Sequence, residues 1–142
     1  MADTTSAVIS NITTLSAARP VVTLTDNTTI TEDQSGYIFF IATDAKTITL
    51  PKVADVEPGF WFTVINSGAS GNNIVTLSPN AADGIFGEIA NAAQDSAPSG
   101  ANGKDLVNTK ATAIKGDRVT LVANGDADWF VIEGVGIWAS EA

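Results

Sequence analysis

The chain has 142 residues, which is enough for one domain with a core that needs no covalent cross-link. It contains no cysteine and no histidine, which excludes thiolate zinc sites, thiol nucleophiles and every catalytic arrangement built on an imidazole. Seven Lys and Arg stand against 16 Asp and Glu, and this net charge of −9, with scattered basic residues, disfavours binding to nucleic acid.

Residues 1–20 are rich in Ser, Thr and Ala, with few large side chains, and we expect them to form an extended N-terminal arm or a short fraying helix. They lack the basic and apolar regions of a secretory signal. No apolar run in the chain reaches the roughly 18 residues that a membrane span needs. We therefore expect a protein that is made in the cytoplasm and has no membrane partner.

From residue 21 onward, short runs of β-branched and aromatic residues alternate with clusters of Gly, Asn, Asp and Pro. This pattern is typical of an all-β sandwich or barrel. It predicts one β-sandwich or jelly-roll-like domain, residues 21–142, of about eight antiparallel strands. The expected strands are 21–25, 37–42, 46–50, 60–66, 73–78, 111–115, 117–123 and 128–133, with a short edge piece at 136–140.

Two of these runs, 37–42 and 60–66, are apolar on both faces. Such strands are either central strands covered on each side or strands whose second face meets a partner chain. The small-residue segment 89–103 is long for a loop inside a compact domain. It is either a functional loop or a flexible connection without a role.

Residues 117–133 predict a β-hairpin with a two-residue turn at Gly125 and Asp126. This register sets Val122 opposite Trp129 and closes the open end with an ion pair between Arg118 and Glu133. One face would then carry Val119, Leu121, Phe130 and Ile132, and the other Arg118, Thr120, Val122, Trp129, Val131 and Glu133.

The acidic residues of this hairpin, Asp126 and Asp128, are expected to shape or flank the exposed turn. The local pattern lacks the spaced acids of a calcium loop, and an exposed turn does not supply the carboxyl of raised pKa that a glycosidase needs. The Gly-rich piece 68–73 has no following Lys-Ser/Thr and precedes a strand, so it predicts a hairpin loop instead of a phosphate-binding loop. We expect no catalytic residue, no metal ligand and no cofactor site.

Large apolar and aromatic side chains outside the expected core are the candidates for contact with a partner. Trp61 could pack in the core instead of contacting a partner, and Trp138 could pack locally. An exposed Trp could also stack on a sugar. The candidate interface residues are Ile9, Ile12, Leu15, Arg19, Trp61, Trp129 and Trp138.

Three segments, 47–68, 73–87 and 109–138, together resemble β-sandwich modules of tailed-bacteriophage virion proteins. The first segment has a Leu-Pro and then a Pro-Gly before an aromatic strand that ends in Asn-Ser-Gly. The second begins with the strand Asn-Ile-Val-Thr-Leu. The third has a Gly-Asp followed by a strand, a turn and the sequence Trp-Phe-Val. Such modules recur in capsid decoration (cement) proteins and in fibre or tailspike domains. The three segments span about half of the chain.

The resemblance implies a structural virion protein that is no enzyme. It would decorate the capsid exterior, often as a homotrimer, and stabilise the shell by bridging capsomers of the major capsid protein. The free-standing size favours decoration over a fibre. The alternatives are a fibre or tail receptor-binding domain that recognises a host surface glycan, and an enzyme that acts on such a glycan. No catalytic residue is carried over from the resemblance.

Overall fold

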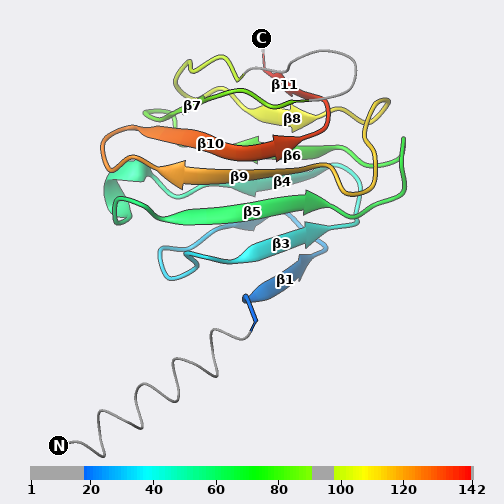
Figure 1. The fold of residues 1–142 in the computed structure, drawn as a ribbon, viewed down its shortest axis with the longest axis horizontal. Helices are drawn as coiled ribbons and strands as arrows, with labels where there is room; N and C mark the ends of the chain where they lie inside the picture. Colours follow the sequence, from blue (N-terminus) through cyan, green and yellow to red (C-terminus); the bar gives the residue numbers. More distant parts are fainter. Residues whose placement is uncertain (1–17, 91–97, 142) are drawn as a thin grey trace, which may run out of the picture.

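The computed structural model describes residues 18–90 and 98–141, which fold into two packed β-sheets (Figure 1). The six-stranded sheet has the order β1-β3-β5-β9-β10-β7 and the five-stranded sheet the order β11-β8-β6-β4-β2. The expected all-β sandwich is therefore confirmed. The strands are β1 (Val21–Leu24), β2 (Thr28–Thr29), β3 (Ile38–Ile41), β4 (Lys46–Thr49), β5 (Trp61–Asn66), β6 (Val75–Ser78), β7 (Gly84–Phe86), β8 (Leu106–Asn108), β9 (Arg118–Ala123), β10 (Asp128–Val135) and β11 (Trp138–Ser140), with a 3-10 turn at Val53–Asp55.

The first six strands wind as three stacked coils, because successive strands alternate between the two sheets. As a result β1, β3 and β5 pair in parallel in one sheet, and β2, β4 and β6 pair in parallel in the other. Antiparallel pairing is confined to β5-β9, β9-β10, β6-β8 and β8-β11 among the described strands. The expectation of an antiparallel sandwich is wrong in this respect. A strand on the opposite sheet serves here as the crossover that a parallel pair needs.

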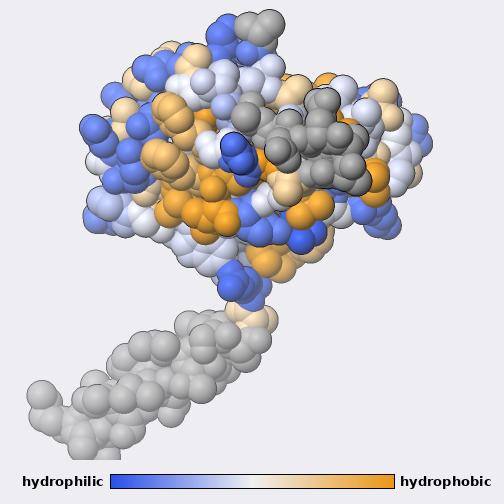
Figure 2. Space-filling model, turned by 45° about the horizontal axis from the view of Figure 1, so that its top comes forward, coloured by the Kyte–Doolittle hydropathy of each residue, from blue (hydrophilic) through white to orange (hydrophobic). Residues whose placement is uncertain are grey.

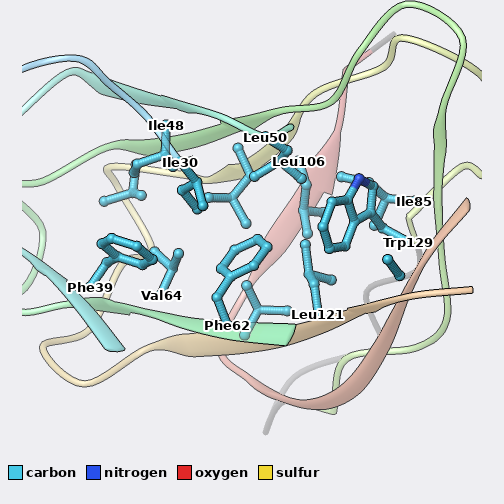
Figure 3. Close-up of a cluster of buried hydrophobic side chains, with 14 of the residues drawn as sticks. Ile30, Phe39, Ile48, Leu50, Phe62, Val64, Ile85, Leu106, Leu121 and Trp129 are labelled. Carbon is cyan, nitrogen blue, oxygen red and sulfur yellow. The ribbon is translucent and has the colours of Figure 1, made fainter. Parts of the chain in front are cut away.

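The core lies between the sheets and is built around aromatic rings (Figure 3). Phe62 of β5 meets Phe39 of β3 edge-on at 6.2 Å between ring centres and Trp129 of β10 at 5.4 Å. Aliphatic side chains of the five-stranded sheet, among them Ile48 and Leu106, close over these rings. Edge-to-face packing of this kind adds to the free energy gained by burying the rings.

The β9-β10 hairpin forms as expected, but its register differs by one residue from the expected one. Trp129 pairs with Ala123 instead of Val122, because the connection is longer than two residues. The side-chain oxygen of Asn124 accepts the N–H groups of Asp126 and Asp128 at 2.9 and 3.1 Å and thereby holds this wider turn.

The changed register exchanges the two faces of β10. Trp129 is fully buried in the core, while Phe130 and Ile132 are on the outside, 39% and 61% exposed. A bulge between Val131 and Glu133 then shifts the pairing once more. The predicted ion pair is confirmed: Nη2 of Arg118 lies 2.9 Å from Oε1 of Glu133.

One expected strand, 111–115, is wrong. This segment is a turn, in which the carbonyl of Thr109 accepts the N–H groups of Thr112 and Ala113 at 3.0 and 2.8 Å. The strand that pairs with β6 is β8, just upstream, where Leu106 and Asn108 point into the core.

The expected arm, 1–20, falls mostly outside the described residues. Its last residue, Pro20, already joins the sheet, because its carbonyl accepts the N–H of Ile38 at 2.9 Å.

Candidate interaction surface

The outer side of the six-stranded sheet, which we call the outer face, carries many apolar side chains. The strand registers place one set of side chains on the side of this sheet away from the core. Figure 2 shows hydrophobic residues gathered on this side of the molecule. The apolar residues of the outer face are Val21, Ile38, Phe40, Trp61, Ile65, Phe86, Val122, Phe130 and Val135, which the registers place there, and Ile132 of the bulge, which lines a groove with Trp61 and Val122.

Several members of the outer face are well exposed. Val21 is 57% exposed, Ile132 61%, and Phe86 and Phe130 are each 39% exposed. Phe86 and Phe130 stack with 5.6 Å between ring centres, which extends the apolar surface to the edge strand β7. Monomeric soluble proteins rarely expose large apolar patches, so this face is a candidate docking surface.

The outer face is electrically almost neutral, although the chain carries a net charge of −9. The charged pair on it, Arg118 and Glu133, neutralises itself through two contacts of 2.9 Å to the same carboxylate oxygen. Arg19 lies at the border of the face and stacks on Trp61. Another protein can therefore approach this side without meeting the repulsion that an acidic surface gives.

An open groove of about 420 Å³ lies on the outer face over β5, β9 and β10. The guanidinium carbon of Arg19 lies 4.7 Å from the centre of the Trp61 ring, a cation–π contact. The hydroxyl oxygens of Thr63 and Thr120 are 2.7 Å apart and hydrogen-bonded to each other. The groove is lined by Arg19, Trp61, Thr63, Thr120, Val122 and Ile132.

A second hollow of about 550 Å³ lies beside the loop before β3 and the 3-10 turn. Its lining carries the acids Glu32, Asp33 and Asp55 together with Lys52. Within residues 18–90 and 98–141, no three acidic side chains lie close enough together to hold a metal ion. Asp83 lies near this hollow, and burial raises the pKa of its carboxyl although the N–H of Val53 donates to it at 2.8 Å.

A buried polar cluster joins the two sheets near the ends of β5 and β8. The side-chain amide of Asn66 donates to Oδ1 of Asn108 at 2.7 Å, and the amide of Asn108 donates to Asp117 at 3.0 Å. The same Asp117 oxygen accepts the N–H of Ile114 at 2.9 Å. These groups satisfy one another, so the cluster is structural and presents no group to a substrate.

The expected interface residues end up in three different places. Arg19 and Trp61 come together in the groove on the outer face. Trp129 and Trp138 are 0% and 1% exposed and pack in the core. The expectation that they lie at an interface is therefore corrected. The other three, Ile9, Ile12 and Leu15, lie outside the described residues.

Most of the outer face could not be predicted from the sequence. The expected register groups Phe130 and Ile132 on one hairpin face with Val119 and Leu121, without saying which way that face points. The structure buries Val119 and Leu121 and exposes Phe130 and Ile132. Phe86 is not part of any expected strand.

One sequence feature did indicate this surface. The run 60–66 is apolar on both faces, and its second face is expected to meet either a covering layer or a partner chain. Its strand, β5, lies in the middle of the sheet, with alternate side chains buried in the core and half-buried on the outer face.

A comparison with protein-family models found no match, and a comparison with curated proteins found none either. No helix among the described residues has the length and apolar character needed to cross a membrane.

Proposed function

We propose that this protein is a structural component of a tailed-phage virion that docks on the exterior of the capsid through its outer face. The observation that carries the proposal is the exposed, almost neutral apolar surface of the six-stranded sheet on a chain of net charge −9. The resemblance of the three sequence segments to virion modules supplies the class of partner, which is the major capsid protein.

The proposed role is to stabilise the shell. A protein that binds the assembled capsid and not its separate subunits shifts the equilibrium toward the assembled state by mass action. The aromatic and branched aliphatic side chains of the outer face are of the type that dominates binding energy at protein interfaces. The role needs no catalysis.

The test compares two isoleucines of equal exposure. Ile132 on the outer face is 61% exposed, and Ile114 in the turn after β8 is 62% exposed. We expect Ile132→Asp to lose binding to purified capsids in co-sedimentation, whereas Ile114→Asp binds as the wild type does. If both variants bind equally well, the outer face is not the docking surface.

Copy number tests the function independently of the surface. A decoration protein is present in many copies per particle and a fibre in few, so the ratio of this chain to the major capsid protein in purified particles decides between them. A ratio of a few copies per particle would contradict decoration.

The groove favours a second candidate, a receptor-binding domain for a host surface glycan. The half-buried indole of Trp61 and the hydroxyls of Thr63 and Thr120 combine an aromatic surface with hydrogen-bonding groups, as small-molecule sites do. A glycan array with the wild type and Trp61→Ala tests this candidate, and a hydrolysis assay on any bound glycan tests for an enzyme. A hit that Trp61→Ala abolishes would favour the receptor-binding role.

A further inference from the structure

The strand β1 ends the six-stranded sheet, and no strand among the described residues pairs with its outer edge. In Figure 1 it forms the lower border of the sheet. The opposite border is different, because the carbonyl of Ile85 in β7 accepts the N–H of Gly100 at 3.0 Å. An open edge is a template for pairing with another strand.

β1 is short, with four residues, but it lacks the other features by which proteins usually block such an edge. Its sequence, Val21-Val22-Thr23-Leu24, contains no charge and no proline, and its pairing with β3 has no bulge. Val21 is 57% exposed.

The pairing with β3 determines which backbone groups of β1 are free. Val21 pairs with Ile38, and the N–H of Ile38 donates to the carbonyl of Pro20. Alternate residues of a strand direct their backbone groups to the same side. The N–H and C=O groups of Val21 and Thr23 therefore point away from β3, toward the open edge.

We propose that two copies of the chain pair antiparallel through β1, around a two-fold axis that passes by Val22. In this register Val21 of one copy lies opposite Thr23 of the other, and Val22 lies opposite its own counterpart. It brings the N–H and C=O groups of both Val21 and Thr23 in each copy into hydrogen-bonding position. Registers shifted by two residues leave part of these groups unpaired.

The charges beside β1 favour a second copy in this orientation. Arg19 precedes the strand and Asp26 follows it, and both are exposed. The guanidinium of Arg19 lies over Trp61 of β5, on the sheet side of β1, so antiparallel pairing places the Arg19 end of one copy beside the Asp26 end of the other as a longer-range attraction and not as a direct ion pair. Parallel pairing would bring the like-charged ends together. An interface that uses one surface patch twice is the arrangement of a two-fold dimer.

The pairing would join the two six-stranded sheets into one, so that the outer faces of both copies form a continuous surface. It does not depend on the proposed function, because it concerns the chain alone. It also differs from the trimer that the resemblance implies, and the mass of the assembly distinguishes the two.

Because the chain has no cysteine, a single introduced cysteine reports contacts between copies. In the proposed register the two Val22 residues form a non-hydrogen-bonded pair, with Cα atoms about 4.5 Å apart, which is close enough for a disulfide. We expect Val22→Cys in the full chain to form a disulfide-linked dimer on mild oxidation. Val21→Cys is the control, since its two copies would be offset along the strands and too far apart to bridge. Equal cross-linking of both variants, or cross-linking of Val21→Cys alone, would overturn the register.

Native mass spectrometry of the full chain tests the pairing itself. We expect a species of twice the 14.6 kDa chain mass for the wild type and for Thr23→Val, which keeps the backbone N–H. Thr23→Pro removes that N–H on the open side and leaves the bonds to β3, so the dimer should be lost with an unchanged circular dichroism spectrum. A wild type that is monomeric or trimeric up to its solubility limit would refute the proposal. If Thr23→Pro misfolds, the cross-linking pair still decides.

Discussion

The side-chain amide of Asn66 in β5 donates a 2.7 Å hydrogen bond to Oδ1 of Asn108 in β8, and so ties one sheet to the other inside the core. Both residues are almost fully buried, at 1% and 0% exposure. The side-chain amide of Asn108 in turn donates hydrogen bonds to Asp117 at 3.0 Å and to the carbonyl of Ile137 at 3.1 Å. Two apolar sheets could slide past each other, and this polar link holds them in one alignment.

Replacing Asn108 by Leu, of similar size, should destabilise the fold strongly. The substitution removes the hydrogen bonds of Asn108 to Asn66, Asp117 and the carbonyl of Ile137, and losing a buried partner costs about 1–3 kcal/mol each. Asn66 keeps its bond to the carbonyl of Asn73, and Asp117 keeps the N–H of Ile114. We expect a loss of about 3 kcal/mol or more in the free energy of unfolding, measured by urea denaturation. Asn72→Leu, the same change at an exposed position of the neighbouring loop, should alter it by less than about 0.5 kcal/mol. Similar effects of the two changes would show that the link is dispensable.

Two buried tryptophans differ in one hydrogen bond. The indole N–H of Trp138 donates to the carbonyl of Val135 at 3.2 Å, whereas the indole nitrogen of Trp129 is buried without a partner. Trp→Phe removes a satisfied donor from one site and an unsatisfied donor from the other. We expect Trp138→Phe to be more destabilising than Trp129→Phe by about 1–2 kcal/mol. Urea denaturation of both variants measures the difference, and the reverse order would contradict it.

Asp83 should make the wild type less stable at neutral pH than a neutral side chain would. Burial raises the pKa of its carboxyl above the usual 3.8, so the folded chain binds this proton more tightly than the unfolded chain does. The contribution of this group to stability is complete below pH 3.8 and is lost as pH rises through the raised pKa. Asp83→Asn keeps an oxygen for the N–H of Val53, so it should melt at a higher temperature than the wild type at pH 7.

This difference in melting temperature should shrink as the pH falls toward 3.8, which calorimetry at several pH values would show. Asp44 is the control with the opposite sign. Its hydrogen bond with Lys110 lowers the pKa of its exposed carboxyl, so its contribution is present above pH 3.8 and is lost as pH falls through the lowered pKa. Asp44→Asn should therefore melt no higher than the wild type at pH 7. A lower melting temperature for Asp83→Asn at pH 7 would disprove the assignment.

Gly136 and Gly116 separate backbone strain from steric contact. Both have positive φ, +110° and +104°, which a side chain tolerates poorly. A Cβ on Gly136 would lie 2.4 Å from the carboxyl carbon of Asp117, whereas one on Gly116 would meet nothing within 4 Å. Gly116→Ala should cost about 1 kcal/mol from strain alone. Gly136→Ala should cost clearly more, because it also displaces the Asp117 carboxylate from its bonds to Asn108 and Ile114. Equal melting temperatures would argue against the steric effect.

Much of the strand assignment could be made from local sequence. Alternating β-branched residues bounded by turn residues predicted the positions of β3, β4, β5, β6 and β9. Three short strands were missed, β2, β7 and β8, because each has at most three residues and shows no clear alternation. The segment 111–115 has the right alternation and still forms a turn, which the hydrogen bonds from Thr112 and Ala113 to the carbonyl of Thr109 hold, and β8 is the strand that pairs with β6.

Two of the candidate interface residues, Arg19 and Trp61, could be found from sequence as single residues, but the surface they belong to could not. Placing Phe86 beside Phe130 requires the parallel pair β7-β10, which joins segments more than 40 residues apart. Placing Phe130 on the outside requires the register that Asn124 sets at the hairpin turn.

By itself the sequence determined that the chain forms an all-β domain, where most of its strands lie, and that the hairpin closes with Arg118 and Glu133. These features depend on side-chain alternation and turn chemistry, which act over a few residues. Only the tertiary structure decided the winding of the first six strands, the direction of their pairing and the composition of the outer face. Those depend on which distant strands bury each other's side chains, and the alternation within a strand is the same whichever neighbour it takes.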